Sequence, residues 1–271
     1  MQRKAVFIDV DGTLVDERGQ LPASAVTAIR RARERGHRVF LATGRSVGEL
    51  WPEILAIGFD GMVCASGSYV EVAGEPLLER YLSQDQIRRI RDYFDAGVGT
   101  FFLQGHAANY ASAEAKARLW ARVEHDAVPR DGAFTFIDTI VTDADPARVE
   151  VSKVIYFEAR VAIDAIRAAF PDLEVVPASV SVLGESAGEL ALAGITKAAG
   201  IDAVLGHLGV DLSDTFALGD SYNDLEMLEH VAVGIAMANA PEAVKTVADD
   251  VTGTPETDGV AEALARYGLT G

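Results

Sequence analysis

The chain has 271 residues, of which 49% are hydrophobic and 24% charged, a composition typical of a globular protein with one or two domains. The net charge of −17 weighs against nucleic acids and anionic membranes as partners, because both are bound through basic surfaces. No apolar run is long enough for a membrane span or a signal peptide. With a single cysteine, Cys64, this predicts a cytoplasmic protein.

Strands and helices are expected to alternate along the first part of the chain. The apolar runs predict strands at residues 4–10, 37–42 and 61–65, with a helix at 22–35 and a short helical stretch between the second and third strands. This alternation is typical of parallel strands joined by right-handed crossovers.

The middle of the chain has a different texture. Strand-like runs alternate irregularly with helical patterns, the strands at 100–103, 153–157 and 173–176 and the helices at 84–94 and 161–170. We expect an inserted α+β domain at residues 82–184.

The C-terminal part returns to the alternating pattern. Helices are expected at 194–207, 223–230 and 241–248, strands at 215–218 and 232–236, a short strand near Val251 and a last helix after Asp258. The predicted fold is therefore α/β: a doubly wound, Rossmann-like parallel sheet formed by residues 1–81 and 185–271, with the α+β domain inserted as a cap.

Two carboxylates follow the first predicted strand. Asp9 and Asp11 are separated by one residue and followed by Gly12, which allows the backbone to approach a ligand closely. One carboxylate of such a pair can attack or hold a metal while the other transfers a proton. A calcium loop would need Asp or Asn in place of Thr13, so EF-hand binding is excluded by the spacing.

Three further segments place polar groups at strand ends or at a helix start, where open α/β sheets bind ligands. The second strand ends at Thr43, Gly44 and Arg45, and Lys197 begins a helix after the insertion. The fourth segment, residues 218–224, carries Asp220 and Asp224 four positions apart. Taken singly, these could be an ordinary turn, a surface lysine and a common Gly-Asp turn.

Taken together and in this order, the four segments resemble the motifs of the haloacid dehalogenase superfamily, and residues 219–224 resemble the Gly-Asp-x-x-Asn-Asp form of its Cof-type phosphatases. The resemblance implies that Asp9 is the nucleophile and that Asp11 is the general acid and base. It implies that Thr43 and Lys197 hold the phosphoryl oxygens, helped by the backbone near Gly12 and by Asn223, and that Gly44 and Arg45 also bind substrate. It implies Mg²⁺ binding by Asp9, Asp220, Asp224 and the Asp11 carbonyl. All these metal ligands are oxygens, which favours magnesium over zinc.

The position of the insertion refines this prediction. It lies between Thr43 and Lys197, as in relatives whose α+β cap, of the C2 or IIB type, follows the third strand. One departure is Ser66-Gly67, where many relatives have Asn-Gly. The expected activity is hydrolysis of a phosphate monoester of a small metabolite through an aspartyl-phosphate. A phosphomutase with the same motifs and a non-catalytic phosphate-binding protein are the alternatives, and the oligomeric state is not predicted.

Overall fold

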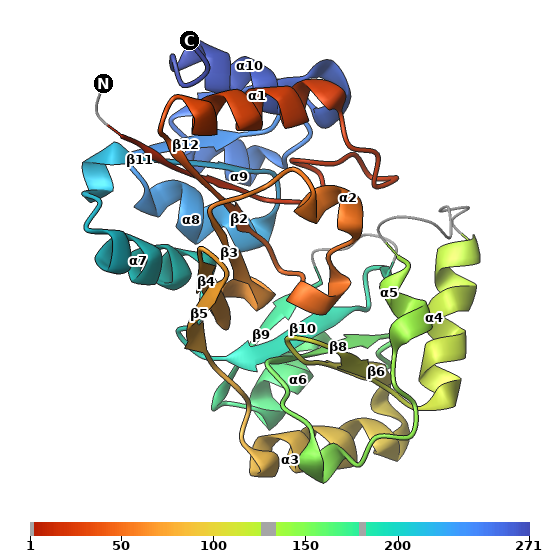
Figure 1. Ribbon diagram of the computed structural model, residues 1–271. Helices are drawn as coiled ribbons and strands as arrows, with labels where there is room; N and C mark the ends of the chain where they lie inside the picture. Colours follow the sequence, from red (N-terminus) through yellow and green to blue (C-terminus); the bar gives the residue numbers. More distant parts are fainter. Residues whose placement is uncertain (1–2, 126–133, 179–182) are drawn as a thin grey trace. The chain divides into compact units, whose positions relative to one another are not determined.

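The computed structural model describes residues 3–125, 134–178 and 183–271, which form two compact units (Figure 1). The first unit contains the residues up to Gly44 together with 52–79 and 196–271, and the second contains 45–51 and 80–195. The chain therefore passes between the units after Gly44, Trp51, Glu79 and Ile195. Each unit is described separately below.

The first unit is built on an eight-stranded sheet with the order β13-β12-β11-β1-β2-β3-β4-β5. The strands from β13 to β3 run parallel, whereas β4 and β5 are antiparallel additions at one edge. The strands are β1 (Ala5–Ile8), β2 (Arg38–Ala42), β3 (Gly61–Cys64), β4 (Tyr69–Val72), β5 (Glu75–Glu79), β11 (Thr215–Gly219), β12 (Val233–Ala236) and β13 (Asp250–Val251).

Helices cover both faces of this sheet. Helix α1 packs against α10, and α7 packs against α8 on the opposite side (Figure 1). The helices are α1 (Ala23–Glu34), α2 (Pro52–Leu55), α7 (Lys197–Leu208), α8 (Leu225–His230), α9 (Glu242–Val247) and α10 (Gly259–Arg266). The predicted doubly wound α/β core is thus confirmed. Among the described residues, no helix is both long and apolar enough to cross a bilayer.

The centre of the sheet is apolar because helices cover it on both sides. Every residue of β1 is buried, as expected for a central parallel strand. Phe7 and Phe40, on the neighbouring strands β1 and β2, stack with their ring centroids 5.2 Å apart. Such packing holds the carboxyl ends of β1 and β2 in fixed positions, and polar residues follow both ends.

The second unit contains a five-stranded antiparallel sheet with the order β7-β6-β8-β10-β9. Its strands are β6 (Thr100–Gln104), β7 (Asn109–Tyr110), β8 (Lys153–Phe157), β9 (Leu173–Pro177) and β10 (Gly188–Leu192), and its helices are α3 (Gln84–Tyr93), α4 (Ala113–His125), α5 (Phe136–Thr139) and α6 (Ile163–Ala169). Buried side chains of α3 and α6, such as Ile90 and Ile166, share a core with Leu190 of β10. This is the expected α+β architecture.

Several elements differ from the sequence prediction. The hairpin β4–β5 and the elements β7, α4 and β10 were not expected, and β10 carries the second unit past Gly184, the expected end of the insertion. Residues 45–51 also cluster with this unit, although they follow β2 in the chain. Within the expected insertion, residues 126–133 and 179–182 lie outside the described residues.

Candidate active site

Asp9 lies directly after β1, at the carboxyl end of the parallel sheet. Its backbone N–H donates to the carbonyl of Leu218 on β11 at 3.0 Å, so the strand pairing fixes its position. The side chain is 4% exposed, and its Oδ1 accepts a hydrogen bond from Nζ of Lys197 at 2.6 Å. Asp9 and Lys197 are 188 positions apart, so folding of the whole first unit is needed to bring them together.

Lys197 is the first residue of α7. The helix begins here because Oγ1 of Thr196 accepts a hydrogen bond from the backbone N–H of Ala199 at 3.2 Å. Lys197 is 1% exposed and also donates to Oδ1 of Asp224 at 2.5 Å. Burial alone would lower the pKa of Lys197, but Asp224 and Asp9 raise it above its usual value, so the ammonium is charged.

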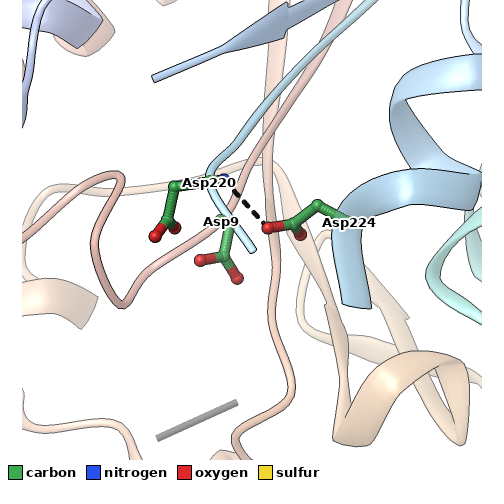
Figure 2. A group of neighbouring side chains, drawn as sticks. All are labelled: Asp9, Asp220 and Asp224. Atoms are coloured by element: carbon green, nitrogen blue, oxygen red, sulfur yellow. Dashed lines mark hydrogen bonds between the residues drawn. The ribbon is translucent and has the colours of Figure 1, made fainter. Parts of the chain in front are cut away.

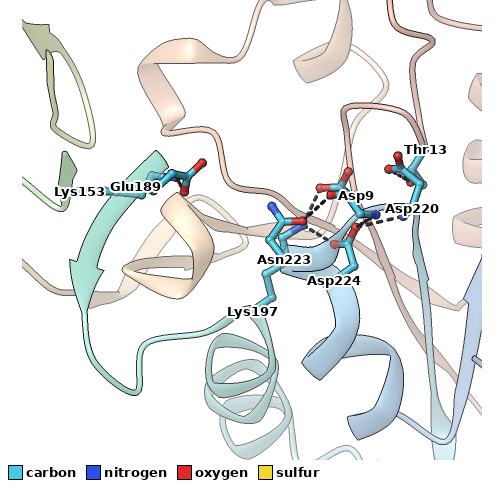
Figure 3. A network of polar contacts seen from close by, with 9 residues as sticks. Asp9, Thr13, Lys153, Glu189, Lys197, Asp220, Asn223 and Asp224 are labelled. Atoms are coloured by element: carbon cyan, nitrogen blue, oxygen red, sulfur yellow. Dashed lines mark hydrogen bonds and ion pairs between the residues drawn. The ribbon is translucent and has the colours of Figure 1, made fainter. Parts of the chain in front are cut away.

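Asp224 organises the loop after β11 (Figure 3). Its Oδ2 accepts hydrogen bonds from the backbone N–H groups of Asp220 and Ser221, both at 3.0 Å, while Oδ1 binds Lys197. The side chain is fully buried. One carboxylate therefore sets the position of both Asp220 and the lysine.

Three carboxylates converge beside this lysine. Asp9, Asp220 and Asp224 each offer an oxygen within 4.8 Å of the others. Figure 2 shows these three side chains gathered together. Burial, followed by repulsion from Asp224, raises the pKa of Asp220 to about 7. Burial also raises the pKa of Asp9 well above its usual value, against the opposing charge of Lys197. When all three are ionised, these carboxylates carry more negative charge than Lys197 compensates, and their oxygen donors fit a hard divalent cation.

The turn between β1 and α1 fits closely against Asp220. Gly12 has a φ of +79°, and a Cβ at this position would overlap the Asp220 carboxylate. Thr13, which is fully buried, donates from Oγ1 to Oδ1 of Asp220 at 3.0 Å. Asp11 lies in the same turn, and its charge contributes to the raised pKa values of Asp9 and Asp220. The turn thus places Asp11 near the cluster, although the carboxylates that lie within 4.8 Å of one another are those of Asp9, Asp220 and Asp224.

Two residues of the site were not singled out from the sequence. Thr13 belongs to the Asp-x-Asp-Gly-Thr segment, so its position beside the motif was the available signal. Asn239, in the loop after β12, donates from Nδ2 to the carbonyl of Gly12 at 2.9 Å and to Oδ2 of Asp220 at 3.3 Å. No pattern around Asn239 indicates this role in the sequence.

Thr43 lies at the end of β2, one strand away from Asp9. It is 1% exposed, its backbone N–H donates to the carbonyl of Val63, and its carbonyl accepts from the N–H of Ser66. Ala65 and Ser66 both have positive φ, at 48° and 55°, a conformation that is costly for residues with a side chain. The departure at Ser66-Gly67 therefore lies in a strained turn hydrogen-bonded to Thr43.

The remaining predicted residues are placed differently. Asn223 lies in the short helix beside Lys197 (Figure 3), and its Oδ1 accepts a hydrogen bond from Oγ of Ser221 at 2.7 Å. Gly44 is the last residue of the first unit before the chain enters the second unit at Arg45. Arg45 belongs to the second unit, where its guanidinium lies over the ring of Trp51, 5.1 Å from the centroid.

Comparison with known proteins identifies the family to which the chain belongs. The sequence profile of the haloacid dehalogenase-like hydrolases matches residues 6–264, nearly the whole chain. The chain belongs to this family. The resemblance to Cof-type haloacid dehalogenase phosphatases, drawn from four short segments of the sequence, is confirmed.

Two named phosphatases match nearly the whole chain. The 5-amino-6-(5-phospho-D-ribitylamino)uracil phosphatase YcsE of Bacillus subtilis is 28% identical and covers 98% of this chain and 96% of its own. A phosphoglycolate phosphatase of Methanothermobacter thermautotrophicus is 26% identical over 97% of this chain and 98% of its own.

Among solved structures, the subclass IIB sugar phosphatase BT4131 superposes with a TM-score of 0.78 at 24% identity, covering 98% of this chain and 99% of that one, which shows a shared fold. With the family match and the named relatives, this haloacid dehalogenase-like hydrolase is a phosphatase.

Proposed function

We propose that the protein hydrolyses a phosphate monoester of a small metabolite, with Mg²⁺ as cofactor and a phosphorylated Asp9 as intermediate. The observation that carries this proposal is the convergence of Asp9, Lys197, Asp220 and Asp224 at the carboxyl end of one parallel sheet. These residues come from three separate segments of the chain, and together they offer a buried nucleophile, a buried cation and oxygen ligands for a metal.

In the first half of the proposed reaction, a carboxylate oxygen of Asp9 attacks phosphorus and the bond to the leaving oxygen breaks. Asp11 gives its proton to that oxygen. Lys197 donates to Asp9 at 2.6 Å and is close enough to stabilise charge on the phosphoryl oxygens, together with the hydroxyl of Thr43. The loose transition state of phosphoryl transfer requires little else from the protein than positioning and positive charge.

In the second half, Asp11, now ionised, takes a proton from water, and the resulting hydroxide oxygen bonds to phosphorus. The bond between phosphorus and the Asp9 oxygen breaks, which regenerates the carboxylate and releases inorganic phosphate. Asp11 ends the cycle protonated, ready for the next substrate. The same residue serves as acid and base because it exchanges one proton with each of the two oxygens in turn.

Oxygen atoms of Asp9, Asp220, Asp224 and the Asp11 carbonyl would hold the Mg²⁺, directly or through water. When bound, such an ion neutralises phosphate charge and favours the ionised form of the nucleophile. The raised pKa values of Asp9 and Asp220 are consistent with this assignment, because burial and the neighbouring carboxylates disfavour their ionised forms, which a bound cation would stabilise. Thr13 and Asn239 would keep Asp220 oriented through their hydrogen bonds.

The proposed substrate is a sugar phosphate or a compound of similar size. YcsE is named for a phosphorylated ribityl compound and BT4131 for sugar phosphates, and both names refer to small phosphorylated metabolites. The net charge of −17 supports this class over nucleic acids and anionic membranes.

The proposal is tested by measuring phosphate release from a panel of phosphorylated metabolites with Mg²⁺. Sugar phosphates, polyol phosphates and phosphoglycolate form the panel, and each substrate is repeated with a chelator and with the Asp9→Asn variant. We expect release from at least one member of the panel, lost in both controls. Release that persists with the chelator would exclude the metal, and isomerised product without free phosphate would indicate a phosphomutase.

A further inference from the structure

The segment Arg45–Trp51 belongs to the second unit although it continues directly from β2 of the first. It contains a 3₁₀ helix, Val47–Glu49, and its residues are largely buried. The chain thus leaves the first unit after Gly44 and returns to it at Pro52, in addition to the passages at Glu79 and Ile195. The chain therefore crosses between the two units at four points, and one of these crossings begins next to Thr43.

The carboxylate of Glu49 attaches this segment to the β6–β7 hairpin. Its Oε2 accepts from Nε2 of Gln104 at 2.6 Å, and its Oε1 accepts from Nδ2 of Asn109 at 2.7 Å. Gln104 and Asn109 are register partners on the two strands of the hairpin. We call these three side chains the Glu49 clamp. Oε2 also accepts from the backbone N–H of Ser46 at 2.9 Å, so the same carboxylate caps the short helix of the segment.

Backbone contacts reinforce the Glu49 clamp. The N–H of Gly48 donates to the carbonyl of His106 in the hairpin loop at 2.9 Å. A Cβ at position 48 would lie 2.5 Å from the carbonyl oxygen of Ala107, so only glycine allows this approach. At the start of the segment, the guanidinium of Arg45 covers the ring of Trp51. The segment is therefore held along its length rather than at one residue.

Thr43 is held equally firmly on the other side of this link. Its N–H and carbonyl both bond to the backbone around β3, at 2.8 and 3.0 Å. Only Gly44 separates Thr43 from Arg45, and two peptide units span at most about 7 Å. A displacement of the second unit relative to the first must therefore be absorbed at Gly44 or transmitted to Thr43.

We propose that Glu49 is a positioning residue that couples the second unit to the phosphoryl-binding residue Thr43 through the segment Arg45–Trp51. The inference rests on the proposed function, because it takes Thr43 as a ligand of the phosphoryl oxygens. With the Glu49 clamp intact, the position of the hairpin determines where Thr43 can present its hydroxyl. Without it, the segment is released from the hairpin and Thr43 is no longer constrained from that side.

The chemistry of the Glu49 clamp provides a conservative variant. In Glu49→Gln, the amide carbonyl can keep the hydrogen bonds from Ser46 and Gln104. The new amide N–H can then donate to Oδ1 of Asn109, which makes no hydrogen bond in the structure, once the Asn109 amide rotates. Glu49→Met keeps a side chain of similar length but has no acceptor of comparable strength. Comparing Glu49→Gln with Glu49→Met therefore separates the effect of the hydrogen bonds from the effect of side-chain size.

The experiment follows the fluorescence of Trp51 during titration with orthovanadate and Mg²⁺. The chain has two tryptophans, so the Trp120→Phe background leaves Trp51 as the only reporter. In this background we expect a fluorescence change on vanadate binding, retained in Glu49→Gln. In Glu49→Met we expect the fluorescence change to be lost. We also expect the apparent Kd for vanadate to rise about 10- to 100-fold, the effect of displacing a ligand residue such as Thr43 by about 1 Å.

Two controls keep the result interpretable. Ile166→Val removes one methylene from the core of the second unit without touching the Glu49 clamp, and it should leave vanadate binding unchanged. Asn109→Leu removes one hydrogen bond of the Glu49 clamp and should weaken vanadate binding in the same direction as Glu49→Met but by a smaller factor. This variant provides the test if Glu49→Met does not fold. A folded Glu49→Met with unchanged vanadate affinity and fluorescence response would overturn the proposal, as would a Glu49→Gln as impaired as Glu49→Met.

Failure of the proposed function would look different. Vanadate binding requires no turnover, so the fluorescence titration decides the role of Glu49 before any substrate is known. In activity assays, loss of the coupling should lower kcat in Glu49→Met by a similar factor while Asp9→Asn removes turnover altogether. If the wild-type protein released no phosphate from any substrate, the catalytic proposal would fall, whereas a Glu49-dependent vanadate response would still support the coupling.

Discussion

Two buried lysines, one in each unit, show how differently the same side chain can be used. Lys153 on β8 of the second unit is 2% exposed and pairs with Glu189 on β10 at 2.6 Å. Lys197 in the first unit is 1% exposed and bonds to two carboxylates, Asp9 and Asp224. Both lysines avoid the cost of a buried, unpaired charge.

The difference lies in the charge around each lysine. Arg45 and Lys153 face Glu49 and Glu189 in the second unit, two cations for two carboxylates. Lys197 faces the three carboxylates of Asp9, Asp220 and Asp224, which leaves two negative charges uncompensated when all are ionised. Among the described residues, the second-unit cluster thus pairs each carboxylate with a cation, whereas the cluster around Lys197 has the excess of carboxylates that we propose to bind a metal ion. The excess corresponds to the charge of one divalent cation.

Replacing Asp9, the proposed nucleophile, should have the largest effect on activity. Asp9→Asn removes one charge from the unbalanced cluster with little change in shape, so the protein should fold. Without the attacking oxygen, kcat should fall on the order of 10⁴-fold or more. Phosphate release under saturating substrate measures the loss, and circular dichroism verifies the fold. Activity close to that of the wild type would exclude the covalent mechanism.

Replacing Lys197 should have the next largest effect. Lys197→Met leaves the three carboxylates without their ammonium partner and removes the proposed donor to the phosphoryl oxygens. We expect kcat/KM to fall about 10²- to 10³-fold, the range for the loss of one charge-stabilising donor. Lys153→Met, in the balanced cluster, serves as the matched control and should leave the chemical step intact. Equal losses in both variants would contradict the distinction between the two lysines.

Breaking the balanced pair should affect stability instead. Glu189→Gln leaves Lys153 buried without its partner and should lower the free energy of unfolding by about 3 kcal/mol. The double variant Lys153→Met/Glu189→Leu removes both charges and should lie within about 1 kcal/mol of the wild type. Urea unfolding of the three proteins measures these differences. A double variant as unstable as the single one would show that the pair itself stabilises the second unit.

The smallest expected effect is a pH dependence of Mg²⁺ binding. The pKa of Asp220 is raised to about 7, so in the metal-free protein this carboxyl keeps its proton between its unfolded pKa near 4 and pH 7. The folded state then binds more protons than the unfolded state, and stability falls as the pH rises through this window. Mg²⁺ must displace that proton, so its affinity should rise about tenfold per pH unit up to pH 7.

Thermal shift measurements test this pH dependence. The increase in Tm caused by Mg²⁺ should be larger at pH 8 than at pH 5.5, and Asp220→Asn should remove most of it. Asp172→Asn, which changes an exposed carboxylate of the second unit, is the control and should leave the Mg²⁺ response intact. An increase in Tm that is independent of pH would mean that no carboxylate of the cluster is protonated near neutrality.

Much of the fold was predictable because strong local patterns agree with the tertiary structure. The strands β1, β2 and β11 are short apolar runs that end at polar motifs, and their buried positions follow from that pattern. The hairpin β4–β5 was missed because its turn, Ala73-Gly74, has positive φ at both positions without the Asn-Gly or Asp-Gly signal of such turns. β10 was missed because Glu189 interrupts its apolar face, and its partner Lys153 is 36 positions away.

The candidate site shows the same limit. Asp9, Lys197, Asp220 and Asp224 could be singled out because each lies at a strand end or helix start within a motif. Asn239 and Glu49 could not, because the contacts that define their roles are to residues distant in sequence: Gly12 is 227 positions from Asn239, and Gln104 is 55 positions from Glu49. Local patterns predict which groups carry the chemistry, whereas the groups that orient them are visible only once the chain has folded.

The most direct test of the account is to look for the phosphoryl group on Asp9 itself. The enzyme is mixed with an active substrate and Mg²⁺, quenched in acid during turnover, digested and analysed by mass spectrometry. If Asp9 is the nucleophile, the peptide containing Asp9 gains the mass of one phosphoryl group, and this gain is absent in Asp9→Asn. Turnover without any phosphorylated peptide, or with the group on another residue, would contradict it.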